Sequence, residues 1–305
     1  LFFFLILSSS LSFSQKSLNN VDELVKSNVK IKDSSAKSLR KPVDKKAKPP
    51  IELYKIYNLQ KDTTFVDTTL SIQKEYKYNL LRKDNFGLLP FSNEGQTYNT
   101  LNFSLNKQNA SPNFGFTAKH FNYLEASDIK YYNVPTPLTD LYFKTVMEQG
   151  QSVDAFLTIN TKPNLNFSIA YKGLRSNGKY INSITSSGNL RFTASYFSNN
   201  KKYYLNAHFA GQDISNQENG GITDVSLFEI SESPYNERDR LDVYFKDATS
   251  FLKGNRFFID HSYKINAGSL NNLVVFHQFN QEYKFFEFSQ PTVSTRFGNS
   301  YTSSI

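Results

Sequence analysis

The stretch LNFSIAYK (165–172) alternates large apolar side chains with polar or small ones. Its odd-numbered positions carry Leu, Phe, Ile and Tyr, and its even-numbered positions carry Asn, Ser, Ala and Lys. Successive side chains of a β-strand point to opposite faces of a sheet, so this pattern predicts a strand with one apolar and one polar face. A helix would instead repeat its apolar positions every three to four residues.

The same alternation recurs along the chain from about residue 97 onward. Six further segments show it: 101–105, 114–120, 190–196, 203–209, 241–245 and 257–263. Residues 272–288 are also strand-like, with an ambiguous facing. A chain with 28 Phe, 19 Tyr and many polar turn residues favours such strands over a helical bundle.

One alternating segment is longer than the others. From Leu141 to Ile159 the phase is unchanged across EQGQ (148–151), which we interpret as one long strand rather than two strands joined by a turn. The connections then alternate between short (106–112, 161–163, 198–201) and long (122–139, 174–187, 211–239). Short turns at one end and long loops at the other are typical of outer-membrane β-barrels.

The net charge of +8 is concentrated near the start of the sequence. Residues 15–50 contain ten basic and four acidic residues, which indicates a solvated tail rather than a nucleic-acid-binding face. The chain contains no Cys, which excludes disulfides, thiolate metal sites and a thiol nucleophile. Its four His leave little for a His-based metal centre, and we expect no cofactor.

The chain divides into four regions by composition. LFFFLILSSSLSFS (1–14) resembles a signal peptide without its basic start, cleaved before Gln15. Residues 15–50 predict a basic disordered linker, 51–96 an N-terminal extension or plug, and 97–305 a β-barrel domain. The ending YTSSI lacks a terminal aromatic residue, so we expect the sequence to be truncated at both ends.

Two fold classes explain alternating strands: a membrane β-barrel and a soluble exported β-sandwich. The apolar rows are rich in Phe, Leu and Tyr, the opposite rows carry charge in mid-strand, and an export signal is present. Aromatic residues near strand ends suit interfacial girdles: Tyr98, Phe121, Tyr123, Tyr171, Tyr196, Tyr203, Tyr204 and Tyr263. We therefore predict an all-β, transmembrane, antiparallel up-and-down barrel, with about 9–10 strands in this chain.

Several long stretches resemble the putative porin family of the Bacteroidetes outer membrane. They are KEYKYNLLRKDNFGLLPFSNEGQTYNTL (74–101), KHFNYLEASDIKYYNVPTPLTDLYFKTVMEQGQSVDAF (119–156), YKGLRSNGKY (171–180) and NQENGGITD (216–224). The resemblance covers about 51–305 and implies an outer-membrane barrel with a pore. It implies no catalytic residues.

Charged and polar side chains on the polar rows are the candidate lumen-facing residues. They are Lys119, Lys144, Asp154, Lys172, Arg191, His208, Asp260 and Lys264. A hydrated lumen would pass small polar solutes, and the excess of Lys and Arg predicts a mild anion preference. Membrane lipid and solutes are the expected partners, and the sequence leaves open a homo-oligomer or a partner protein.

Two other functions remain open at this point. A structural or secretion-linked barrel would bind a partner through 122–139 and 211–239, and a soluble exported module would bind a ligand outside the membrane. Enzymatic activity has little support, because HisSer (261–262) has its His on the apolar row and no GxSxG motif occurs. Residues 74–96, with mixed charge, could enter the barrel mouth, pack beneath it or add one strand.

Overall fold

The computed structural model describes residues 49–69, 71–102, 121–146, 149–230, 232–266, 273–294 and 296. The expected signal peptide, nearly all of the expected linker, the strand at 114–120 and Lys119 lie outside these residues. None of the described helices is long and apolar enough to cross a membrane.

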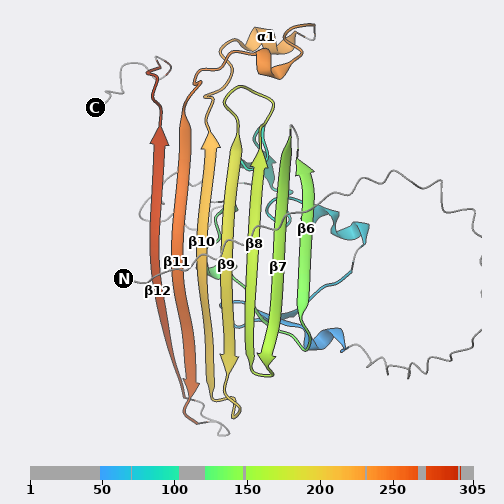
Figure 1. Cartoon of the computed structure of the whole chain (residues 1–305), viewed down its shortest axis with the longest axis vertical. Coiled ribbons are helices and arrows are strands. Elements are labelled where there is room, and N and C mark those ends of the chain that lie inside the picture. The colour runs from blue at the N-terminus through green and yellow to red at the C-terminus, as the bar shows by residue number, and fades with distance from the viewer. Residues whose placement is uncertain are drawn as a thin grey trace, which may run out of the picture. The chain divides into compact units, whose positions relative to one another are not determined.

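Seven antiparallel strands form the main sheet, in the order β12-β11-β10-β9-β8-β7-β6 (Figure 1). They are β6 (Leu138–Val146), β7 (Gly150–Lys162), β8 (Leu165–Ser176), β9 (Thr185–Phe197), β10 (Tyr203–Gln217), β11 (Thr249–Lys264) and β12 (Val274–Ser289). Each strand pairs with its neighbours in sequence, which confirms the all-β, up-and-down topology. The sheet is open over the described residues, consistent with part of a barrel.

The prediction of one strand from Leu141 to Ile159 is wrong, because β6 ends at Val146, β7 begins at Gly150, and the two strands pair antiparallel. Val146 pairs with Gly150, and Gln149 adopts a left-handed conformation (φ 56°). Residues that face each other across an antiparallel pair lie on the same face. A loop with an odd number of residues therefore preserves the apolar phase, so an unbroken phase does not exclude a turn.

The expected strand at 241–245 is also wrong. Leu241, Val243 and Phe245 are buried on alternate positions, but they belong to the long connection 218–248. This segment runs beside 219–223, where Tyr244 N–H donates to the Gly221 carbonyl and Phe245 N–H donates to the Asn219 carbonyl. Alternating apolar and polar residues indicate that one side of an extended segment is buried. An extended loop can be buried on one side just as a strand of the main sheet can. The same connection contains α1 (Val225–Glu229) and η5 (Arg238–Arg240).

The expected strands at 165–172, 190–196, 203–209 and 257–263 are present as parts of β8, β9, β10 and β11, and residues 272–288 correspond to β12. β8 to β11 have 12 to 16 residues each and are longer than the alternating segments that predicted them. Leu101 and Asn102 follow a short strand and are not themselves in one, and 103–105 lie outside the described residues. Connections at 163–164 and 198–202 are short and lie at one end of the sheet, opposite the long connection 218–248. The three-residue connection between β6 and β7 lies at the same end as 218–248, so the predicted alternation of short and long connections holds only in part.

The main sheet exposes its apolar face and buries much of its polar face, which is the opposite of the burial in a soluble domain. Large apolar side chains on one face, here called the apolar face, are exposed, including Leu141 (74%), Phe192 (43%) and Phe257 (44%). Side chains on the other face, here called the polar face, are buried although many are polar: Ser152, Thr158, Asn166, Ser168, Lys172, Asn189, Thr193, His208, Gln212, Arg256 and Asp260. A soluble domain buries its apolar side chains instead.

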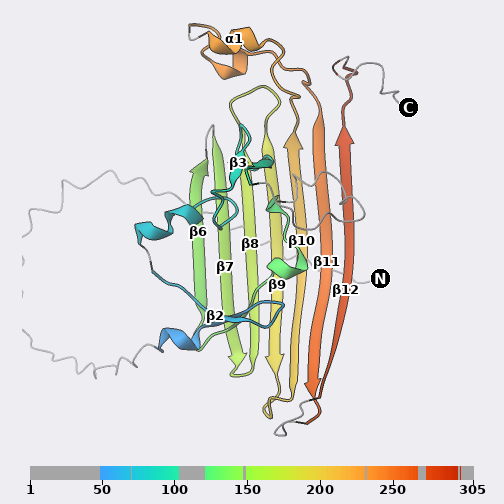
Figure 2. The ribbon, with the colours of Figure 1, turned by 180° about the vertical axis from the view of Figure 1, so that it is seen from behind.

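The described residues of 49–133, here called the N-terminal segment, lie over the polar face of the main sheet (Figure 2). Their elements are short: η1 (Ile51–Leu53), β1 (Lys55–Tyr57), β2 (Thr63–Phe65), η2 (Ile72–Lys77), β3 (Leu88–Pro90), β4 (Tyr98–Thr100), η4 (Ala126–Asp128) and β5 (Tyr131–Asn133). β2, β1 and β5 form a three-stranded sheet, and β3 pairs with β4. Most of this segment thus lacks the strand periodicity of 138–289.

Two small apolar clusters hold the N-terminal segment against the sheet. Leu80 packs against Val146 of β6 and Leu174 of β8. Tyr123 packs against Ile214 of β10 and Leu252 of β11. Because these clusters lie toward opposite edges of the sheet, they hold the N-terminal segment in place across most of the width of the sheet.

Aromatic residues border the exposed apolar face, as expected for some of the predicted girdle positions. Tyr203 and Tyr263 pair at one level of the sheet, and Tyr171 lies nearer the long-loop end. The prediction is wrong for Tyr98, Phe121 and Tyr123, which belong to the N-terminal segment, where Phe121 packs on the buried Tyr98. It is also wrong for Tyr204, which lies on the polar face beneath Lys264. Burial raises the pKa of Tyr98 to about 12.

Gly254 of β11 lies where Tyr123 approaches the sheet, and a Cβ there would overlap the Tyr123 hydroxyl. We expect Gly254→Ala to displace Tyr123 and destabilise the protein by about 1–3 kcal/mol, the usual cost of overpacking. The measurement is a denaturant titration followed by circular dichroism. The matched control is Gly211→Ala on β10, where the added Cβ would be 3.3 Å from Asn255 Oδ1. Equal midpoints for the two variants would contradict the close approach.

Candidate functional site on the polar face

All the predicted lumen-facing residues that the structure describes lie on the polar face. They are Lys144, Asp154, Lys172, Arg191, His208, Asp260 and Lys264. Their alternation with apolar neighbours was sufficient to assign the face. Their partners, which lie far away in sequence, were not predicted.

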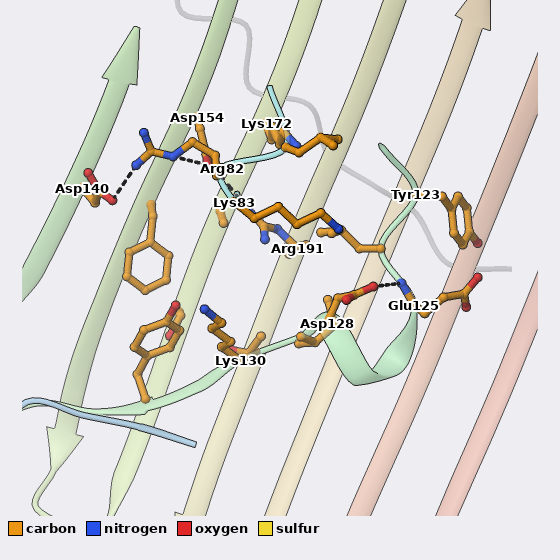
Figure 3. Close-up of a pocket in the computed structure, with 18 of the residues that line it drawn as sticks. Arg82, Lys83, Tyr123, Glu125, Asp128, Lys130, Asp140, Asp154, Lys172 and Arg191 are labelled. Atoms are coloured by element: carbon orange, nitrogen blue, oxygen red, sulfur yellow. Dashed lines mark hydrogen bonds and ion pairs between the residues drawn. The ribbon is translucent and has the colours of Figure 1, made fainter. Parts of the chain in front are cut away.

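An ion-pair network joins the N-terminal segment to β6, β7 and β9. Asp154 of β7 lies 3.5 Å from Arg191 of β9 and 3.7 Å from Arg82 of the N-terminal segment. Arg82 also lies 3.4 Å from Asp140 of β6 (Figure 3). Its guanidinium stacks over the ring of Tyr142. Two guanidinium groups thus face two carboxylates, so this part of the face has little net charge.

Three further predicted residues find partners in the N-terminal segment. Lys144 lies 3.7 Å from Glu94, and the Lys172 ammonium donates to Asn122 Oδ1 at 3.0 Å. The Tyr131 hydroxyl is hydrogen-bonded to His208 Nδ1 at 2.8 Å. Because a buried polar group without a partner costs free energy, these contacts stabilise the polar face while it is covered.

The last two predicted residues have partners within the main sheet. Asp260 accepts a hydrogen bond from Gln278 of β12 at 3.1 Å. Lys264 lies near the end of β11, with its ammonium 5.2 Å from the ring centroid of Tyr204. Neither residue depends on a described contact with the N-terminal segment.

Amide and hydroxyl groups anchor the N-terminal segment near the long-loop end. Asn93 donates to the carbonyl of Ser183 at 2.7 Å and accepts from the Ser176 hydroxyl at 2.6 Å. The Thr185 hydroxyl donates to the Glu94 carbonyl at 2.6 Å. Gln212 of β10 both donates to and accepts from the backbone of Leu124. These bonds satisfy backbone groups that the short elements of the segment leave unpaired.

Arg256 of β11 is the most buried charged residue of the site, at 1% exposure, and sequence reasoning missed it. Its guanidinium lies 2.7 Å from Glu282 of β12 and 2.9 Å from Glu125, and it donates to the Leu124 carbonyl. Arg256 precedes the clearest part of its strand by one residue. Extending the alternation of 257–263 by one position would have placed it on the polar face.

Tyr123 completes this second network. Its hydroxyl donates to Glu282 Oε1, and Lys284 lies over its ring at 4.1 Å. Burial, together with the hydrogen bond to Glu282, raises the pKa of Tyr123. The hydroxyl therefore stays protonated and remains a donor throughout the physiological range.

A cavity of about 610 Å³ separates the N-terminal segment from the wall formed by β6 to β9 (Figure 3). Five basic side chains line it: Arg82, Lys83, Lys130, Lys172 and Arg191. Four acidic side chains line it as well: Glu125, Asp128, Asp140 and Asp154. Over the described ranges, no group of three or more His, Asp or Glu is arranged to hold a metal ion. Nine charged side chains of both signs thus line the cavity.

Replacing Arg256 with Met would leave Glu282 beside Tyr123 without its strongest partner. We expect a loss of about 3 kcal/mol, the lower end for breaking a buried pair, because Glu125 is half-exposed and can be rehydrated. A denaturant titration measures the loss. Lys284→Met is the control and should cost under about 1 kcal/mol, because its pair with Glu125 is partly solvated. If both variants lost the same free energy, Arg256 would not anchor the segment.

The family comparison matches most of the chain. A family model described as "Putative porin" matches residues 50–305. No curated protein and no solved structure matches the chain significantly. The match covers the main sheet and the N-terminal segment together, including the networks around Asp154 and Arg256. The chain therefore belongs to the putative porin family.

Proposed function

We propose that the protein forms a water-filled channel in the outer membrane of a Gram-negative bacterium, through which small polar solutes diffuse passively. The observation that carries this proposal is the reversed burial of the main sheet. Apolar rows remain exposed and polar rows are buried. Lipid hydrocarbon would solvate the first set and a hydrated lumen the second.

The height of the apolar face supports a membrane environment. From Tyr203 to Gly211, β10 advances eight residues, or about 27 Å at ~3.4 Å per residue. At the usual tilt this is close to the roughly 25 Å apolar band of outer-membrane barrels. Beyond this level the outward positions become polar, with Arg175, Asp213 and Lys253 all exposed.

The course of the N-terminal segment supports an orientation. Asn133 at its end contacts the Pro163 carbonyl at a short turn, whereas Asn93 contacts Ser183 beside the long connection. The segment therefore runs from the short-turn end to the long-loop end and back. Short turns lie on the periplasmic side in known outer-membrane barrels, so we place the short-turn end of the sheet on the periplasmic side. This agrees with export through the expected signal peptide.

The N-terminal segment favours the plug among the options for 51–96. It contacts the polar face through Arg82, Asn93 and Glu94 and adds no strand to the main sheet over the described residues. In a closed barrel this face would line the lumen, so the segment would narrow the channel. Solutes would then pass through the hydrated space beside the segment.

A second candidate function is a barrel with a filled lumen that binds a partner protein in secretion or uptake. The observation that favours it is the same covering of the polar face, together with the long connection 218–248. Its α1 exposes Val225 and Phe228. A partner that co-purifies with the protein, combined with no conductance, would favour this role.

A soluble exported binding module fits the structure less well. A β-sandwich packs its apolar rows against a second sheet, whereas no described element covers the apolar face here. Recovery of the protein in the soluble periplasmic fraction would overturn both barrel proposals. We also propose no enzymatic activity and no resident cofactor.

A channel must conduct ions. We expect the protein purified from outer membranes to open discrete conductances in planar lipid bilayers. In a salt gradient the reversal potential should show a mild anion preference, because Lys83, Lys130 and Lys172 face the cavity without a described carboxylate partner. Cation preference would contradict the selectivity, and the absence of conductance would contradict the pore.

A charged side chain introduced on the apolar face should lower the free energy of unfolding strongly only where that face contacts lipid. Ile169 lies outward in the middle of β8, so Ile169→Lys should destabilise the protein in lipid vesicles by about 2–4 kcal/mol. The control is Val225→Lys, which puts the same charge at an exposed apolar position of α1 outside the apolar band and should change stability by less than about 0.5 kcal/mol. Denaturant titration in vesicles measures both. Equal effects would show that Ile169 does not face lipid.

A further inference from the structure

The cavity between the N-terminal segment and the wall holds more basic charge than its acidic residues neutralise, and this inference rests on the proposed channel. Its lining comes from both parts of the protein: Lys83 and Lys130 from the N-terminal segment, and Lys172 and Arg191 from β8 and β9. A solute in this space would therefore contact the fixed wall and the segment at once.

The acidic residues of the cavity are already engaged. Asp140 and Asp154 lie within ion-pair distance of Arg82 and Arg191, as described above, although Asp154 Oδ1 has no hydrogen-bond partner among the described residues. Glu125 is paired with Arg256 at 2.9 Å and with Lys284 at 3.2 Å. Asp128 accepts a hydrogen bond from the Glu125 backbone N–H at 2.9 Å. A cationic solute would have to displace one of these partners to reach a carboxylate.

The basic residues are less fully engaged. Among the residues that the structure describes, no carboxylate lies within ion-pair distance of Lys83, Lys130 or Lys172, and the Lys172 ammonium contacts only the amide oxygen of Asn122. Arg191 is paired through one terminal nitrogen, while its buried Nε has no hydrogen-bond partner there. Thr193, also in the lining, has a buried hydroxyl without a described partner. Unused donors and unpaired positive charge thus share one cavity.

In the view of Figure 3, Arg191 lies between Lys83 and Lys130. We propose that this cavity is a binding site for a small oxyanion, a carboxylate or a phosphate, held by Lys83, Lys130, Lys172 and Arg191. Ammonium and guanidinium groups form their strongest hydrogen bonds with such oxygens. The cavity volume of about 610 Å³ admits a solute of metabolite size with its water. A bound anion would be selected before it passes the channel.

The test is calorimetric titration of the folded protein in detergent with inorganic phosphate, at constant ionic strength set by sodium chloride. We expect saturable binding, and at least a tenfold loss of affinity in Lys83→Ala combined with Lys130→Ala. Both lysines are exposed, and circular dichroism checks that the variant is folded. The control is Lys201→Ala, an exposed lysine of the 198–202 turn, which should leave the affinity unchanged. No saturable binding, or equal affinity in all three proteins, would overturn the site.

Two further arms separate the ligand classes and the two proposals. Citrate in place of phosphate shows whether carboxylates bind more tightly than phosphate, and spermine shows whether the site instead prefers cations, which would overturn it. Conductance in bilayers tests the channel independently. Phosphate binding without conductance would support the site and overturn the channel. Conductance without phosphate binding, and without any reduction by phosphate, would support the channel and overturn the site.

Discussion

The pleat of the β-strand is the constraint on which the structure depends. It sends alternate side chains to opposite sides, so one sequence pattern creates an apolar row and a polar row together. Neither row can be left without a suitable environment. The apolar row remains exposed in the described chain, which only a nonpolar solvent would favour, and the polar row is paired with side chains of residues 80–131.

The face of the sheet on which each side chain lies could be predicted, because it depends only on the neighbouring residues in the strand. The polar face received Asp154, Lys172, Arg191 and His208 as expected, since each alternates with apolar residues in its own strand. Strand connectivity was less predictable. A turn of three residues keeps the phase intact, so β6 and β7 look like one strand, and the loop at 241–245 looks like a strand because it is buried on one side.

The covering of the polar face could not be predicted from local pattern. Arg82, Asn93 and Tyr123 belong to a segment without periodicity, and their partners lie 58 to 159 residues away. The sequence offered only mixed charge in 74–84 as a signal. Such contacts depend on complementary shape and charge between two surfaces, and single positions carry little of that information.

A covered polar face and a conducting channel are compatible when the cover is held by pairs rather than by close packing. The contacts around Arg82 and Arg256 neutralise charge at a few points, and the apolar clusters at Leu80 and Tyr123 are small. Between them lies a cavity lined by both charged and apolar side chains. Charged walls favour a hydrated space. Removing water from the lysine and arginine side chains costs free energy unless other hydrogen-bond partners replace that water. In the proposed channel, the segment would narrow the lumen without drying it, and the charges that hold the segment in place would also determine which solutes pass beside it.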